Sequence, residues 1–187
     1  VTAWPLLVEA HRQKGLMQMK VSLGEVSNAT WQRKMTIDHD LEVMRPWHYS
    51  TYLVKDDITL SFAPSKKSAV YKVDFPAVSG KNILISGSDR MLVNVTGTHA
   101  FALEETISYM VRGITPTERT MQVYCYAELT NEQGTALKNI RFTHQKNKLV
   151  ITSATSQKET VLLKYAVSYI SAEQAKKNFA IDRKSVV

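Results

Sequence analysis

Apolar side chains alternate with polar ones through most of this 187-residue chain, and this alternation constrains the fold more than any other feature. A spacing of two places the apolar side chains on one face of an extended strand. The runs that show it are Ile58–Phe62, Tyr71–Phe75, Met91–Val95, Phe101–Val111, Met121–Leu129, Ile140–Phe142, Leu149–Ile151 and Val161–Tyr169. Short polar, glycine-containing turns separate many of these runs. The pattern predicts an all-β fold, a two-sheet antiparallel β-sandwich.

The two ends of the chain follow different patterns. Residues 1–36 are less regular, with one strand expected over Met17–Leu23. After the last alternating run, Ser171 and Gln174 have the spacing of a helix-capping box, and a short helix is expected over Ala172–Ala180. We therefore divide the chain into an N-terminal segment (1–36), a sandwich core (37–170) and a short helix leading out of the domain (171–187).

Composition excludes several classes of protein. The net charge is +7, but the lysines and arginines are scattered rather than gathered in one stripe, so we expect a solvated basic surface and no nucleic-acid partner. No run approaches the roughly 20 apolar residues of a membrane span, so no membrane association is expected. The one cysteine, Cys125, alternates with Val123 and Ala127, which predicts a buried thiol rather than a nucleophile.

Ionisable and aromatic side chains are concentrated between Ile37 and Leu53, just before and within an alternating strand. This density predicts a functional loop at the rim of a sheet. Aromatic faces stack on sugar rings, and charged side chains bind sugar hydroxyls. Tyr49 and Tyr52 could equally be half-buried strand residues, and Trp47 a core residue beside Pro46. The candidates for sugar contact are His39, Glu42, Arg45, Trp47, His48 and Tyr49.

Two other kinds of chemistry are weaker candidates. A metal site could draw on the acidic and histidine side chains between residues 38 and 48, but their spacing matches no helical metal motif, and no metal site is expected. Glycoside hydrolysis needs two carboxyl groups, which Asp38, Asp40 and Glu42, or the pair Glu104 and Glu105, could supply. Charged turn and strand-edge residues are the commoner explanation, so no catalytic residue is assigned.

The concentrated segment resembles a loop-strand motif of glycoside hydrolase family 92, the calcium-dependent exo-α-mannosidases. That motif reads Phe-Ser-His-x-x-Glu-x-x-x-Pro-(Gly/Tyr)-Tyr-Tyr-x-Val-x-Leu, and the matching residues here are His39, Glu42, Pro46, Tyr49 and Leu53. A second resemblance covers 167–179, which is similar to the step from strand to helix that ends the family's front domain. Asp38, Trp47, His48 and Thr51 depart from the family's usual residues.

The resemblance implies a supersandwich-like N-terminal domain that is not itself catalytic. In the family this domain packs on an (α/α) helical barrel and walls the cleft that binds a mannose-containing glycan. The barrel carries the catalytic acid, the base and most calcium ligands, so calcium is expected in the intact enzyme and not in this chain. Hydrolysis would invert the anomeric carbon, and this chain alone is expected to be inactive. A bacterial periplasmic or extracellular location is implied.

Two alternative functions remain. One is a free-standing carbohydrate-binding module, in which the aromatic and charged side chains of the 37–53 segment bind sugar without a partner domain. The other is a structural sandwich that serves only protein contacts and would expose a large apolar patch.

Overall fold

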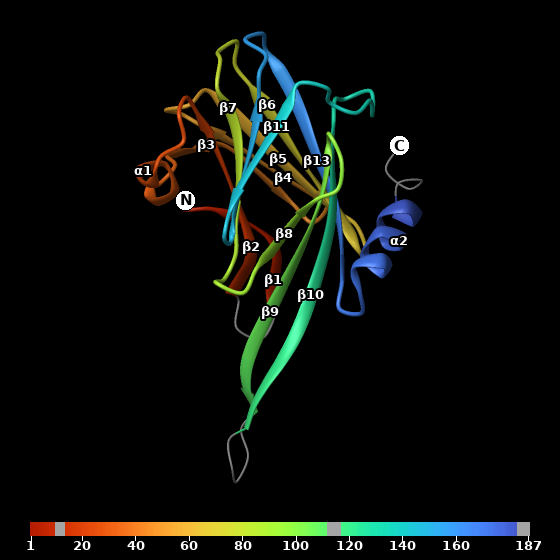
Figure 1. The fold of residues 1–187 in the computed structure, drawn as a ribbon. Helices are drawn as coiled ribbons and strands as arrows, with labels where there is room; N and C mark the ends of the chain where they lie inside the picture. Colours follow the sequence, from red (N-terminus) through yellow and green to blue (C-terminus); the bar gives the residue numbers. More distant parts are fainter. Residues whose placement is uncertain (10–13, 112–116, 183–187) are drawn as a thin grey trace.

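The alternating runs form strands of two antiparallel sheets in the computed structural model, which describes residues 1–9, 14–111 and 117–182 (Figure 1). The smaller sheet contains, in spatial order, β1 (Trp4–Glu9), β2 (Lys14–Leu23), β7 (Lys81–Ser86), β12 (Lys148–Ser153) and β11 (Ile140–Gln145). The larger sheet contains β3 (Ile37–Arg45), β4 (His48–Leu53), β5 (Ile58–Pro64), β6 (Ser68–Phe75), β13 (Glu159–Ser168), β10 (Thr117–Thr130), β9 (Ala100–Val111) and β8 (Leu92–Val95). The predicted two-sheet sandwich is confirmed.

The core lies between the two sheets and is built from one face of each strand. On the larger sheet the register places Leu60 beside Val73 and Val73 beside Val161, and all three side chains are buried. Ile83, Ile85 and other apolar side chains of the smaller sheet complete the core from the opposite side. The spacing of two in the sequence therefore corresponds directly to the buried face.

Two strands of the smaller sheet, β1 and β7, were not predicted from the sequence. Strand β7 reads Lys-Asn-Ile-Leu-Ile-Ser, and its first five residues are all buried, so it shows no alternation. Ile83 and Ile85 belong to the core between the sheets, and Leu84 is buried as well. A strand covered on both faces reads as a continuous apolar run. The predicted strand over Met17–Leu23 is confirmed as part of β2.

The expectation of a loop between Ile37 and the following strand is wrong. These residues form β3, the edge strand of the larger sheet, and β3 and β4 make a hairpin that turns at Pro46 and Trp47. No residue of β3 is fully buried. A strand exposed on both faces at a sheet edge tolerates the charged residues that suggested a loop.

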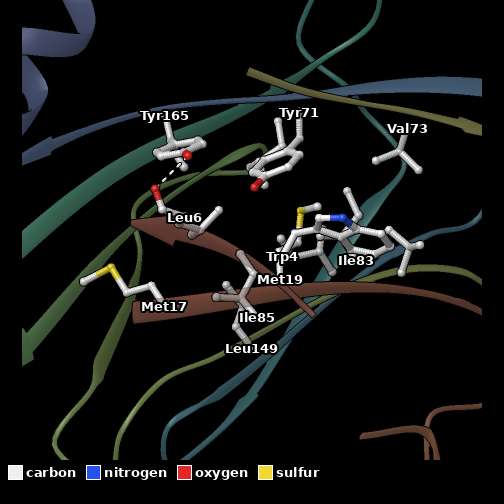
Figure 2. Close-up of a cluster of buried hydrophobic side chains, with 14 of the residues drawn as sticks. Trp4, Leu6, Met17, Met19, Tyr71, Val73, Ile83, Ile85, Leu149 and Tyr165 are labelled. Atoms are coloured by element: carbon white, nitrogen blue, oxygen red, sulfur yellow. Dashed lines mark hydrogen bonds between the residues drawn. The ribbon is translucent and has the colours of Figure 1, made fainter. Parts of the chain in front are cut away.

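Hydrogen bonds from buried tyrosines join the two sheets. The hydroxyl of Tyr71 donates to the main-chain carbonyl of Pro5 at 2.7 Å, and the hydroxyl of Tyr165 donates to that of Leu6 at 2.7 Å. Figure 2 shows Tyr165 reaching across the core to β1. Burial raises the pKa of both hydroxyls above the ordinary tyrosine range, so both remain neutral donors. These two hydrogen bonds therefore hold β1, the edge strand of the smaller sheet, against the larger sheet.

A buried carboxylate makes a further connection between the sheets. Glu105, on β9 of the larger sheet, accepts the backbone N–H of Met17 at 3.2 Å and that of Ser88 at 2.7 Å. Met17 has φ of 49°, a left-handed conformation that is uncommon outside glycine. The carboxylate satisfies the amide at this irregular point of β2. Glu105 therefore has a structural contact, while Glu104 is its strand neighbour and points to the opposite face.

The chain leaves the last strand through the predicted helix. Ser171 caps helix α2 (Ala172–Asp182), because its Oγ accepts the backbone N–H of Gln174 at 3.0 Å. Its apolar residues Ala175 and Phe179 pack against Tyr126 and Ala166, outside the main core. Helix α1 (Asn28–Gln32) was not predicted and is only one turn long. Among the described residues, neither helix has the length and apolar character needed to cross a membrane.

Cys125 is a buried free thiol, as the alternation predicts. Burial raises its pKa to about 12, which keeps the sulfur protonated at neutral pH. The residue is therefore part of the core and not a nucleophile.

We expect Tyr165→Phe to destabilise the domain by roughly 1–3 kcal/mol, because the Leu6 carbonyl loses its donor in a buried site. Urea unfolding followed by circular dichroism measures this change. Tyr52→Phe is the matched control, since Tyr52 donates to Asp57 at the exposed surface. Equal destabilisation by the two substitutions would contradict the role given to Tyr165.

Candidate functional site

The candidate residues lie on the β3–β4 hairpin, which contains a wide irregularity. Asp38 pairs with Tyr52 and Val43 pairs with Ser50, so the four residues His39–Glu42 lie opposite Thr51 alone. Such a bulge interrupts the ladder and redirects the side chains of the longer strand. The four residues read His-Asp-Leu-Glu, a run in which apolar and polar side chains do not alternate. The bulge brings residues of the two strands together in a way that spacing alone does not reveal.

Three of the six predicted residues form one hydrogen-bonded cluster, which we name the Glu42 cluster: His39, Glu42 and Tyr49. The hydroxyl of Tyr49 donates to Oε1 of Glu42 at 2.6 Å, and Nδ1 of His39 lies 3.1 Å from Oε2. Tyr49 packs against the main core, whereas the His39 side chain is 78% exposed. The cluster therefore runs from the core to the solvent along one edge of the sheet.

The hydrogen bonds of the Glu42 cluster shift the pKa values of Glu42 and Tyr49 in opposite directions. The pKa of Glu42 is lowered, first by the hydrogen bond from Tyr49 and then by that from His39. The pKa of Tyr49 is raised, first by burial and then by its bond to the Glu42 carboxylate. At neutral pH the cluster therefore holds a carboxylate with a fixed orientation. Such a group can accept hydrogen bonds from sugar hydroxyls or from main-chain amides.

The other three predicted residues lie at the turn of the hairpin. Arg45 pairs with His48 at the ends of the two strands, and Trp47 is between them. The Trp47 side chain is 65% exposed, which excludes its alternative role as a core residue. Tyr52 belongs to neither group, because its hydroxyl donates to Asp57 at 2.9 Å.

An apolar groove adjoins the Glu42 cluster through Tyr49. It has a volume of about 610 Å³ and lies between β1 and strands β4, β5, β6 and β13. Trp4 and Phe62 line it together with Tyr49. This groove was not predicted from the sequence. Trp4 belongs to the irregular N-terminal segment, and the position of its side chain depends on how the two sheets pack together.

The acidic residues at the start of β3 make a local contact. The oxygen of Asp38 accepts the backbone N–H of Asp40 at 3.0 Å, a local turn contact. Within residues 1–9, 14–111 and 117–182, no group of three or more histidine, cysteine, aspartate or glutamate side chains is arranged to hold a metal ion.

Comparison with known proteins supplies the family. The family described as the glycosyl hydrolase family 92 N-terminal domain matches residues 15–176. No curated protein matches the sequence.

Solved structures agree in fold. A family GH92 alpha-mannosidase from Bacteroides thetaiotaomicron is 15% identical with a TM-score of 0.69, over 91% of this chain and 26% of that one. A family GH92 inverting mannosidase from Bacteroides thetaiotaomicron VPI-5482 is 16% identical with a TM-score of 0.69, over 89% and 23%. The chain thus spans about a quarter of the mannosidases it matches.

We expect Tyr49→Phe to raise the pKa of Glu42, because the substitution removes the hydrogen bond that lowers it most. The lowered pKa also makes the stability of the fold depend on pH. A carboxyl group whose folded-state pKa is depressed stabilises the fold at pH values above its unfolded-state pKa. That stabilisation is lost as the pH falls through the folded-state value. Carbon NMR of the glutamate carboxyl groups, titrated between acid and neutral pH, measures the change.

Tyr52→Phe serves as the control for this titration, since Tyr52 bonds to Asp57 and not to Glu42. An unchanged Glu42 titration in Tyr49→Phe would contradict the geometry of the cluster.

Proposed function

The chain belongs to the glycosyl hydrolase family 92 N-terminal domain family, and we propose that it walls the sugar cleft of an α-mannosidase. In this proposal the domain is not catalytic and packs on a helical barrel domain of the same polypeptide. The barrel supplies the acid, the base and the calcium ligands. The substrate is a mannose-containing glycan, and the enzyme acts in the bacterial periplasm or outside the cell.

The observation that carries the proposal is the Glu42 cluster beside the exposed Trp47. Glu42 is held by Tyr49 and His39, so its carboxylate is oriented before any ligand arrives. Trp47 presents an aromatic ring to the solvent at the adjoining turn. An oriented carboxylate and an exposed aromatic ring are the two kinds of group that hold a sugar ring, one at its hydroxyls and one at its apolar face.

Exposed apolar side chains on the same hairpin support a contact with another domain. Leu41 is 56% exposed and Met44 is 77% exposed, in addition to Trp47. Large apolar side chains gathered at one edge of a sheet are a common mark of an interaction surface. The hairpin could therefore contact both the barrel and a sugar bound between the two domains.

The division of labour follows from what inverting hydrolysis requires. An acid must protonate the leaving oxygen while a base activates a water on the opposite face, with the two carboxyl groups roughly 6.5–9.5 Å apart. Glu42 is ionised at neutral pH and hydrogen-bonded within its cluster, so we assign it to sugar contact and not to acid catalysis.

We expect the purified 187-residue chain to show no hydrolysis of α-mannosides, because the acid, the base and the calcium site belong to the barrel in this proposal. Release of mannose from an α-linked mannobiose, measured with and without added calcium, tests this. Turnover that copurifies with the chain would overturn the assignment. Tight binding of mannose by the isolated chain would instead favour a free-standing carbohydrate-binding module.

In the intact enzyme, we expect Trp47→Ala and His48→Ala each to lower kcat/KM for a mannoside by about tenfold, or ~1.4 kcal/mol. The reason is the loss of a contact that binds sugar at the cleft. Steady-state kinetics measure the effect, and thermal unfolding verifies that the fold is retained.

The control for these kinetics is Leu92→Ala, which truncates an apolar side chain that is 64% exposed on β8, at the opposite edge of the larger sheet. Unchanged kinetics in the Trp47 and His48 variants, with the fold intact, would refute the role of the hairpin.

A further inference from the structure

A second groove lies on the outer face of the smaller sheet, beside helix α1. Its volume is about 650 Å³. The floor consists of Asn82 on β7 with Val150 and Thr152 on β12, and Arg141 and Thr143 on β11 line one side. The other side is the segment 24–28 together with Trp31 of α1. Segments distant in sequence therefore meet around one polar surface.

Hydrogen bonds hold the floor and the loop side in place. The side-chain amide of Asn82 donates to the carbonyls of Gly24 at 2.8 Å and Gly80 at 2.9 Å. The hydroxyl of Thr152 donates to Oδ1 of Asn82 at 2.8 Å. Gly80 approaches so closely that an added Cβ would lie 3.0 Å from the Gly24 backbone. The groove is therefore formed before any ligand binds, which reduces the ordering cost of binding.

A buried lysine anchors the far part of the same loop. The ammonium of Lys20 donates to the carbonyls of Thr30 at 3.3 Å, Trp31 at 2.8 Å and Arg33 at 2.6 Å. These contacts fix the turn that carries Trp31. They also leave the Trp31 side chain half-buried at the edge of the groove.

Two cations line the groove, Lys148 on β12 and Arg141 on the neighbouring strand β11. The ammonium of Lys148 lies 5.1 Å from the ring centre of Trp31, a cation–π contact that positions the charge at one end. Arg141 pairs with Thr152 of β12. Thr152 is four residues from Lys148 along β12. At ~3.3 Å per residue, the two positions are about 13 Å apart, the length of roughly two to three linked sugar rings. Glu25 is the one carboxylate among the described residues that line the groove.

We propose that this groove binds an acidic oligosaccharide of two or three rings, with Lys148 and Arg141 holding its negative groups. The hydroxyls of Thr152 on the floor and Thr143 at the side supply acceptors for hydrogen bonds from sugar hydroxyls. Arginine and lysine are the usual partners of carboxylate and phosphate groups.

The position of the groove keeps it apart from the proposed cleft. It lies on the smaller sheet beside α1, whereas the Glu42 cluster lies on the larger sheet. The proposal is thus independent of the mannosidase function, and failure of either one leaves the other standing.

The test uses two trisaccharides that share mannose configuration and linkage but differ in charge: β-1,4-trimannuronate and β-1,4-mannotriose. Each is titrated into the ¹⁵N-labelled chain. We expect trimannuronate to shift the amides of 141–145 and 148–152 and the indole N–H of Trp31. We expect it to bind at least about fivefold more tightly than mannotriose, with an affinity that falls as salt rises.

Arg141→Gln and Lys148→Gln should each weaken trimannuronate binding by about threefold to fivefold, the effect of removing one charge from the groove surface. Lys138→Gln removes an exposed charge outside the groove and should leave binding unchanged. Three results would overturn the proposal: no shifts in the groove, equal affinity for the two trisaccharides, or the same shifts produced by inorganic phosphate alone.

Discussion

Two hydroxyl groups that cross the core determine how the smaller sheet sits on the larger one. Tyr71 and Tyr165 donate to the consecutive carbonyls of Pro5 and Leu6 on β1, an edge strand that has a sheet neighbour only at β2 among the described strands. With β1 held there, Trp4 lies beside Tyr49 in the apolar groove. Tyr49 in turn orients Glu42. The candidate site therefore depends on hydrogen bonds to β1 made by tyrosines that border the same groove as Tyr49.

The hairpin combines an irregular edge strand with a group of polar side chains held by hydrogen bonds. An edge strand needs polar or irregular features to avoid pairing with other chains. Here the bulge opposite Thr51 supplies the irregularity, and the residues that it displaces, His39 and Glu42, form the hydrogen-bonded cluster. The bulge that protects the edge thus also brings His39 and Glu42 together with Tyr49 in one hydrogen-bonded cluster at the edge of the sheet.

Most of the larger sheet could be predicted from the sequence, because strands such as β6, β9 and β13 bury alternate residues. Strand β1 was missed although Trp4 and Leu6 are buried and Pro5 and Leu7 only partly so, whereas β7 and β3 were missed because their burial does not alternate. Strand β7 is buried on both faces and β3 is exposed on both, so neither shows the period of two. For the site, the residue types and the family motif identified His39, Glu42 and Tyr49. Their contacts could not be predicted, since they depend on a bulge that no spacing encodes.

The central claim is that the β3–β4 hairpin faces the sugar in the intact enzyme. Hydrogen–deuterium exchange of the full polypeptide, with and without a non-hydrolysable thio-linked mannobioside, tests it most directly. We expect slower exchange at 39–49 when the mannoside is bound, with strands β8 and β9 unchanged. Protection confined to other parts of the polypeptide, with the hairpin exchanging at its free rate, would contradict it.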